Sequence, residues 1–199
     1  YDDVVAFMKA MAAASPQIHL STYGYTFEGR TLPLAVIGAP DASAASVLGT
    51  GKTRVFIQGN IHAGEVEGKE AAQVLLRELA MGQHADWLRS MVFLITPIFN
   101  ADGNEKVSVQ NRTAQYGPVA GVGTRENAKS LDLNRDYMKL DSQEARALVG
   151  LMNKWDPHVL VDLHTTNGSY HANHLTYSPI LNPNADLRLI EFTRERMLA

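Results

Sequence analysis

The chain has 199 residues, of which 45% are hydrophobic and 20% charged, a composition that supports a folded core. Its 18 Lys and Arg against 21 Asp and Glu give a formal net charge of −3, so there is no electrostatic argument for binding nucleic acid. It has no apolar run near the roughly 20 residues of a membrane-spanning helix and no cysteine, which excludes a disulfide framework and leaves only His and carboxylate side chains to bind a metal.

The first third of the chain predicts one helix and three strands. Apolar residues recur at helical spacing over 1–14. Residues 18–25 and 31–37 have the pattern of two strands joined by a turn. Residues 41–52 are rich in Ala, Ser and Gly and predict a surface loop or a short helix, whereas 54–59 is a β-rich run typical of a buried parallel strand.

A helix, a strand and a long loop are expected next. Residues 66–80 predict a helix, and residues 91–99 predict a second buried strand. The polar, Gly-rich stretch 100–134 is too long for a simple connection. Loops of that length usually carry function.

The last third predicts a helix, a strand and a further helix. Residues 141–155 are helical in pattern, with Asp141 and Glu144 spaced as a capping box, and 159–163 predict a third buried strand. Asn182-Pro183 is expected to open a helix that runs to the C-terminus. The alternation of strands and helices predicts an α/β fold with a mixed, mainly parallel sheet sandwiched by helices.

Metal-ligand side chains follow two of the predicted buried strands. His62 and Glu65 come after the first, and His164 comes directly after the third, with Asp162 two residues earlier. Ligands bind at the carboxyl ends of the strands in open α/β sheets, and two His with one carboxylate make a catalytic zinc site. Asp162 is a candidate hydrogen-bond partner for His164. The alternative from the residues alone is that both are hydrogen-bonded core histidines.

Arginines in the long polar region are candidates for substrate binding. Arg125 stands in Arg-Glu-Asn-Ala, and Arg135 ends Asp-Leu-Asn-Arg. Beside a metal, the planar fork of one arginine suits a substrate carboxylate, while another can polarise a carbonyl. The alternative is that both are loop arginines paired with nearby acids.

Five short motifs occur in a fixed order over about residues 54–166. They are His-x-x-Glu, Asn-Ala-Asp-Gly, Arg-x-Asn-Ala, Asp-Leu-Asn-Arg and Asp-Leu-His. In this order they resemble the zinc carboxypeptidases of the carboxypeptidase A type, peptidase family M14. Each motif alone is weak evidence for the family. All five, however, are expected at the edge of the predicted sheet where ligands bind.

The resemblance implies a role for each matching residue. The three residues that match the ligands of one Zn²⁺ ion are His62, Glu65 and His164. Asn134 and Arg135 match the Asn-Arg pair that binds the C-terminal carboxylate of a peptide. Arg125 matches the arginine that stabilises the oxyanion of the tetrahedral intermediate.

Other positions leave the assignment of the substrate-binding residues undecided. Arg112 is a second candidate for the oxyanion role, although Arg125 has the Asn-Ala context seen in bacterial members. Thr165 and Thr166 stand where animal carboxypeptidases have Ser-Tyr, and Asp136 stands where many members have Asn.

The general base of the family is a Glu well downstream of the last zinc ligand, and only 35 residues follow His164. Glu191 and Glu195 match no family motif, so we assign no general base and expect it beyond Ala199. We therefore expect residues 1–199 to be the N-terminal part of a single catalytic domain.

The resemblance implies hydrolysis of the C-terminal peptide bond of a peptide that carries a free carboxylate. Two alternatives remain open. One is a zinc-dependent deacylase of N-acyl amino acids, of the aspartoacylase and succinylglutamate desuccinylase type, and the other is a relative that binds carboxylates without cutting. Family members of this kind are often exported, so a secreted or periplasmic location is expected, although no signal-peptide pattern stands at the start of the chain.

Overall fold

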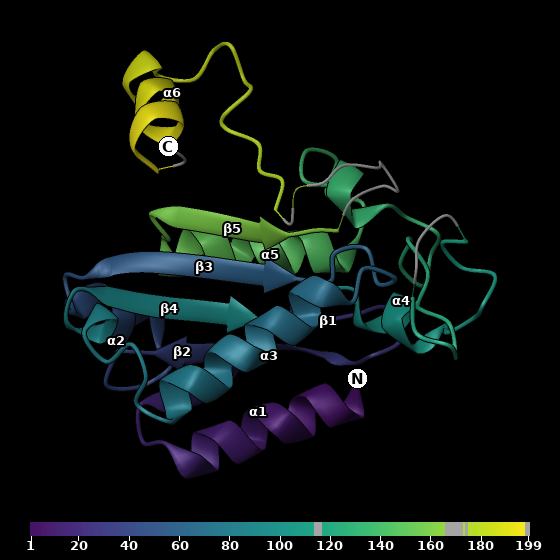
Figure 1. Ribbon diagram of the computed structural model, residues 1–199, viewed down its shortest axis with the longest axis horizontal. Coiled ribbons are helices and arrows are strands. Elements are labelled where there is room, and N and C mark those ends of the chain that lie inside the picture. Colours follow the sequence, from purple (N-terminus) through teal and green to yellow (C-terminus); the bar gives the residue numbers. More distant parts are fainter. Residues whose placement is uncertain (114–116, 166–172, 174, 198–199) are drawn as a thin grey trace. The chain divides into compact units, whose positions relative to one another are not determined.

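The structure is a computed structural model that describes residues 1–113, 117–165, 173 and 175–197 (Figure 1). The chain divides into two compact units, Tyr1–Thr165 and Thr166–Ala199. The first unit carries all of the predicted site residues.

A five-stranded mixed sheet forms the centre of the first unit, in the order β1-β2-β4-β3-β5. The strands are β1 (Ile18–Tyr25), β2 (Thr31–Ile37), β3 (Thr53–Gly59), β4 (Met91–Thr96) and β5 (Val159–Leu163). β2 is antiparallel to both of its neighbours, β1 and β4, whereas β3 is parallel to both of its neighbours, β4 and β5. The arrows of β3, β4 and β5 point the same way in Figure 1.

Helices cover both faces of this sheet. Residues of α1 (Asp2–Ala14) and α3 (Glu67–Ala80) share one apolar cluster with the sheet. Residues of α2 (Ala44–Gly49) and α5 (Gln143–Trp155) share the other cluster. The predicted α/β class, with the sheet sandwiched by helices, is confirmed.

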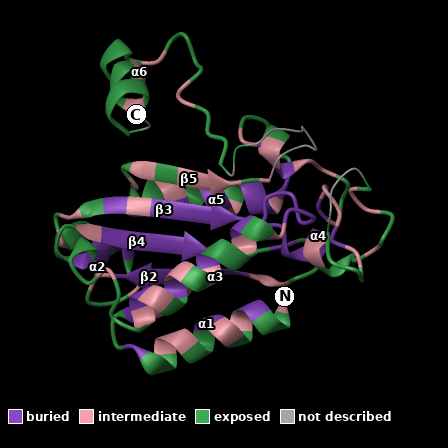
Figure 2. Ribbon diagram, viewed as in Figure 1, coloured by how far each residue is buried: buried purple, intermediate pink, exposed green. Residues whose placement is uncertain are grey.

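The apolar runs of the central strands have a simple cause. In β4, Val92 and Leu94 pack in one cluster, and Phe93 and Ile95 pack in the other. Side chains alternate between the two faces of a strand, so a strand covered on both faces is apolar at most of its positions. Figure 2 shows β4 and most of β3 as buried.

The fifth strand differs from the prediction of a third buried strand. β5 lies at one edge of the sheet in the part of the chain that the structure describes, and its Leu160 is 48% exposed. Only one neighbouring strand, β3, covers its backbone there. The apolar run of 159–163 predicts the strand correctly but not its place in the sheet.

The predicted capping box of α5 is wrong. Ser142, rather than Asp141, caps the helix, and its side chain accepts a hydrogen bond from the Ala145 amide. The Glu144 side chain is buried and accepts hydrogen bonds from the Phe27 amide (3.4 Å) and from Asn127 Nδ2 (3.3 Å). The side chain of Glu144, which the local spacing assigned to the cap of α5, is therefore engaged in tertiary contacts instead.

The last helix begins later than expected. Asn182 accepts a hydrogen bond from the Asn184 amide, the local bond by which Asn favours a turn. In the second unit α6 (Leu187–Phe192) starts after Asp186, which caps it through the Arg188 amide, and a π-helical turn over Thr193–Met197 follows. None of the helices in the described residues is both long and apolar enough to span a membrane.

Shorter elements shape the long polar region. The 3-10 turn Trp87–Arg89 precedes β4, α4 (Ala101–Glu105) follows it, and a second 3-10 turn covers Leu133–Arg135. An isolated bridge pairs Ser108 with Val122. The described parts of the loop expected over 100–134, residues 100–113 and 117–134, are thus folded by local turns and by contacts with the rest of the first unit.

Candidate metal centre

The sheet brings the two predicted ligand segments to one edge. Gly59, at the end of β3, is in register with Leu163, at the end of β5. Because the two strands are parallel and adjacent, the residues that follow them emerge side by side. His62 lies three residues after the first strand, and His164 lies directly after the second.

The three predicted ligands come together around one point. Atoms of His62, Glu65 and His164 that can bind a metal all lie within 4.8 Å of one another. His62 Nδ1 is 3.0 Å from Glu65 Oε1, and His164 Nδ1 is 3.1 Å from Glu65 Oε2. The two imidazole rings are 5.1 Å apart between centroids. The carboxylate thus faces the Nδ1 atoms of both rings.

Each imidazole has a carboxylate at its other nitrogen. His62 Nε2 lies 3.2 Å from Asp132 Oδ1, and His164 Nε2 lies 3.0 Å from Asp162 Oδ2. Such a contact fixes the orientation and tautomer of a metal-binding histidine, leaving the facing nitrogen as the ligand. Asp162 therefore contacts His164, as the sequence predicted. The contact between Asp132 and His62 was not predicted from the sequence.

The cluster holds Glu65 ionised. Burial alone would raise the pKa of Glu65, but hydrogen bonds from His164, His62 and the Thr165 amide hold it well below its ordinary value. Hydrogen bonds to Asp162 and Glu65 raise the pKa of His164 to about 9, against the effect of burial. Because a metal binds the neutral imidazole, a metal ion at this cluster would compete with the proton of His164.

Two arginines contact different carboxylates of the cluster. Arg125 donates to Asp132 Oδ2 through Nε at 3.0 Å and has a terminal nitrogen 2.9 Å from the same oxygen, and its side chain is 37% exposed. Arg112 places a terminal nitrogen 2.9 Å from Glu65 Oε1. Burial alone would raise the pKa of Asp132, but the hydrogen bonds from Arg125 and His62 lower it.

The predicted carboxylate-binding pair begins at the same aspartate. Asp132 Oδ1, which contacts His62, also accepts a hydrogen bond from the Asn134 amide at 3.0 Å and caps the turn Leu133–Arg135. Arg135 is exposed, and its guanidinium donates to the Asn134 carbonyl at 3.0 Å. Both residues are thus close in the chain to a side chain that touches a ligand. Thr166 lies outside the described residues.

The sequence matches the zinc carboxypeptidase family, Peptidase_M14, over residues 4–171. The chain belongs to this family. Carboxypeptidase 2 of Trichophyton rubrum is 30% identical over 161 residues, covering 79% of this chain and 27% of that protein. Carboxypeptidase Z of Mus musculus is 30% identical over 154 residues, covering 73% of this chain and 22% of that protein.

The fold of the zinc carboxypeptidases is also the fold found here. A metallo-carboxypeptidase from Burkholderia cenocepacia superposes with a TM-score of 0.64 at 23% identity, covering 82% of this chain and 40% of that chain. The chain therefore spans less than half the length of this structure and about a quarter of the length of Carboxypeptidase 2. The family resemblance read from the five motifs is confirmed.

Asp136, which replaces the Asn of many zinc carboxypeptidases, is buried beneath the start of α5. It is 3% exposed and accepts hydrogen bonds from Ser142 Oγ (2.6 Å), the Ser142 amide (2.8 Å) and the Asp141 amide (2.9 Å). Burial alone would raise its pKa, but these bonds and the charge of Arg146 lower it. Asp136 thus anchors α5.

We expect Asp136→Asn to lower the free energy of unfolding by about 2 kcal/mol near neutral pH, because hydrogen bonds to a charged acceptor are lost. A lowered pKa means that the contribution is present above the unfolded pKa of about 3.9 and is lost as the pH falls through the folded value. Urea unfolding at neutral and acid pH measures both effects. A difference between wild type and variant that stays constant into acid would contradict this role.

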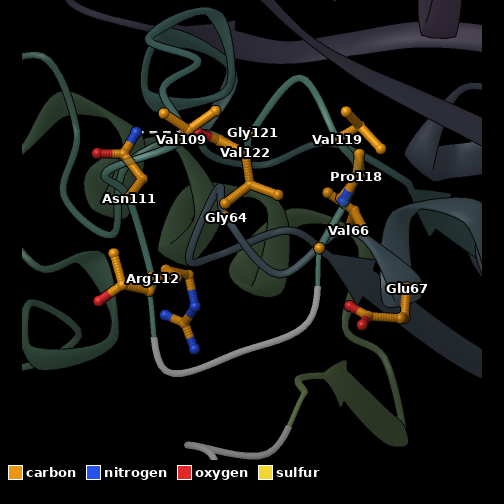
Figure 3. Close-up of a pocket in the computed structure, with 12 residues that line it drawn as sticks. Gly64, Val66, Glu67, Val109, Asn111, Arg112, Pro118, Val119, Gly121 and Val122 are labelled. Carbon is orange, nitrogen blue, oxygen red and sulfur yellow. Dashed lines mark hydrogen bonds between the residues drawn. The ribbon is translucent and has the colours of Figure 1, made fainter.

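A cavity of about 280 Å³ is lined by Arg112, which contacts Glu65 of the cluster, and by Glu67 (Figure 3). Gly64, between the ligands, makes room for the arginine, because a Cβ there would lie 2.4 Å from Arg112 Cδ. The wall combines polar and apolar groups, and it is lined by Gly64, Val66, Glu67, Val109, Asn111, Arg112, Thr113, Gly117, Pro118, Val119, Gly121 and Val122. Neither Asn134 nor Arg135 is part of this wall.

Proposed function

We propose that this protein is a zinc-dependent metallocarboxypeptidase whose Zn²⁺ is held by His62, Glu65 and His164. The observation that carries the proposal is the convergence of two imidazole Nδ1 atoms on one buried, ionised carboxylate. Two His and one carboxylate with an open fourth position is the donor set of catalytic zinc sites. Asp132 and Asp162 place a carboxylate at the Nε2 atom of each imidazole, the kind of contact that orients a metal-binding histidine.

The substrate in this proposal is a peptide with a free C-terminal carboxylate. Asn134 and Arg135 bind that carboxylate, and an internal peptide bond offers none, so cleavage is restricted to the last residue. When bound, zinc polarises the scissile carbonyl and lowers the pKa of water toward ~7. Arg125 lies on the carboxylate that also holds His62, and its guanidinium stabilises the charge that develops on the carbonyl oxygen.

We expect the purified chain to contain about one zinc ion, and the double variant His62→Ala/His164→Ala to contain none, because two of three ligands are removed. Elemental mass spectrometry measures the content. His19→Ala/His84→Ala is the matched control, since it removes two histidines outside the cluster. A wild-type chain that takes up no zinc from a micromolar solution contradicts the proposal, and so does equal loss in the control.

The choice of substrate is tested separately. Release of a C-terminal amino acid from short peptides, with little turnover of N-acetylaspartate or N-succinylglutamate, is the expected result. Faster turnover of the acyl amino acids would move the function to a deacylase. Binding of both without turnover would make the protein a carboxylate-binding relative.

A further inference from the structure

Asn100 is a buried asparagine in the Asn-Ala-Asp-Gly motif, to which the proposed reaction gives no role. It caps α4 just beyond the end of β4 and is 1% exposed. Its Nδ2 donates to the Ile61 carbonyl at 3.3 Å and to the Arg125 carbonyl at 3.2 Å. Its Oδ1 accepts from the Gly103 amide at 3.0 Å. One amide therefore joins the peptide before His62, the peptide of Arg125 and the start of α4.

The chemistry of this position requires a primary amide. A buried carbonyl without a hydrogen-bond partner is costly, and here two carbonyls from different loops face one nitrogen. Only Asn and Gln combine two N–H donors with one acceptor at the end of the side chain. The backbone of Asn100 adds a third tie to the metal loop, since its amide donates to the Asn60 carbonyl at 3.1 Å.

A second buried asparagine, Asn60, supports the metal loop alone. Its backbone is left-handed, with a φ of 65°, and its Nδ2 donates to the carbonyls of Ala63 (3.0 Å) and Glu65 (3.2 Å). None of these contacts reaches Arg125. The two asparagines thus separate two tasks, because Asn60 shapes the ligand loop and Asn100 ties that loop to the loop of Arg125.

We propose that Asn100 is a positioning residue that sets the place of Arg125 relative to the metal ligands. The inference rests on the proposed function, because it assigns Arg125 to the carbonyl oxygen of the substrate. Since a misplacement of about 1 Å from a distant change costs a reaction ~100-fold, a rigid tie between the two loops has a direct effect on the transition state.

The test uses Asn100→Ser, which keeps an oxygen to cap α4 but removes both N–H donors. Calorimetry on the purified chain measures zinc affinity first. It then measures the binding of the zinc-loaded chain to a phosphonate peptide, which mimics the tetrahedral intermediate, and to the matching peptide carboxylate. We expect zinc to bind about tenfold more weakly, and the ratio of phosphonate to carboxylate affinity to fall about tenfold or more.

Two matched variants separate positioning from stability. Asp102→Asn alters the same short helix, but the contacts of Asp102 go to Thr26, Glu28 and Arg30. It is expected to lower the melting temperature and leave both binding readouts unchanged. Asn60→Gly accepts the left-handed backbone and is expected to weaken zinc binding with the affinity ratio unchanged.

Two results would overturn the inference. One is a ratio of phosphonate to carboxylate affinity in Asn100→Ser equal to that of wild type, and the other is a fall of this ratio in Asp102→Asn as large as in Asn100→Ser. If wild type binds no zinc, the proposed function fails and this inference with it, whereas zinc binding with an unchanged ratio in the variant refutes the inference alone. If Asn100→Ser does not fold, Asn100→Asp, which has the same shape and keeps the acceptor, is measured in its place and judged by the same ratio.

Discussion

Replacing Phe56 with alanine is expected to lower the free energy of unfolding by about 3–5 kcal/mol, the cost of removing a large, well-packed aromatic side chain. Phe56 is fully buried in β3, the strand between β4 and β5, and it packs among residues of β2, β4 and α5. Chemical unfolding of the variant, followed by circular dichroism, measures the change.

Leu160 provides the matched control for this expectation. It is in register with Phe56 on the neighbouring strand β5, but it is 48% exposed. Little contact is lost when a half-exposed side chain is shortened, so Leu160→Ala is expected to cost about 1 kcal/mol or less. Equal losses in both variants would show that the two positions of this strand pair are packed alike.

Local patterns were sufficient for most of the elements of this fold. The bounds of β1 and β2 agree with the predicted strands, because alternation and a turn between two strands are features of neighbouring residues. The caps of α5 and α6 were missed, because Ser142 and Asp186 compete with the nearby Asp141 and Asn182, which can also cap a helix. For α5 the choice depends on tertiary contacts, because Phe27 and Asn127 engage the Glu144 side chain.

The candidate site divides in the same way. The structure brings His62, Glu65 and His164 together because β3 and β5 are parallel neighbours that end at one edge of the sheet. The contact of His62 with Asp132 joins residues 70 positions apart, and no spacing rule shows it. A carboxylate just before the Asn-Arg pair was the only available signal.

Arg125→Ala is expected to weaken the binding of a phosphonate peptide to the zinc-loaded chain by about 10²–10³-fold, the effect of losing one donor to a developing oxyanion. Binding of the peptide carboxylate is expected to change little, because Asn134 and Arg135 remain. Isothermal titration calorimetry with both ligands measures the difference. Arg125→Lys keeps the charge but loses the planar fork, so an intermediate loss is expected.

Arg112→Ala decides which arginine has this role. Arg112 contacts Glu65 at 2.9 Å, whereas Arg125 contacts Asp132. If Arg125 stabilises the oxyanion, Arg112→Ala leaves the preference for the phosphonate over the carboxylate intact. The reverse pattern would assign the oxyanion to Arg112. It would also place the scissile carbonyl on the side of the 280 Å³ cavity that Arg112 lines.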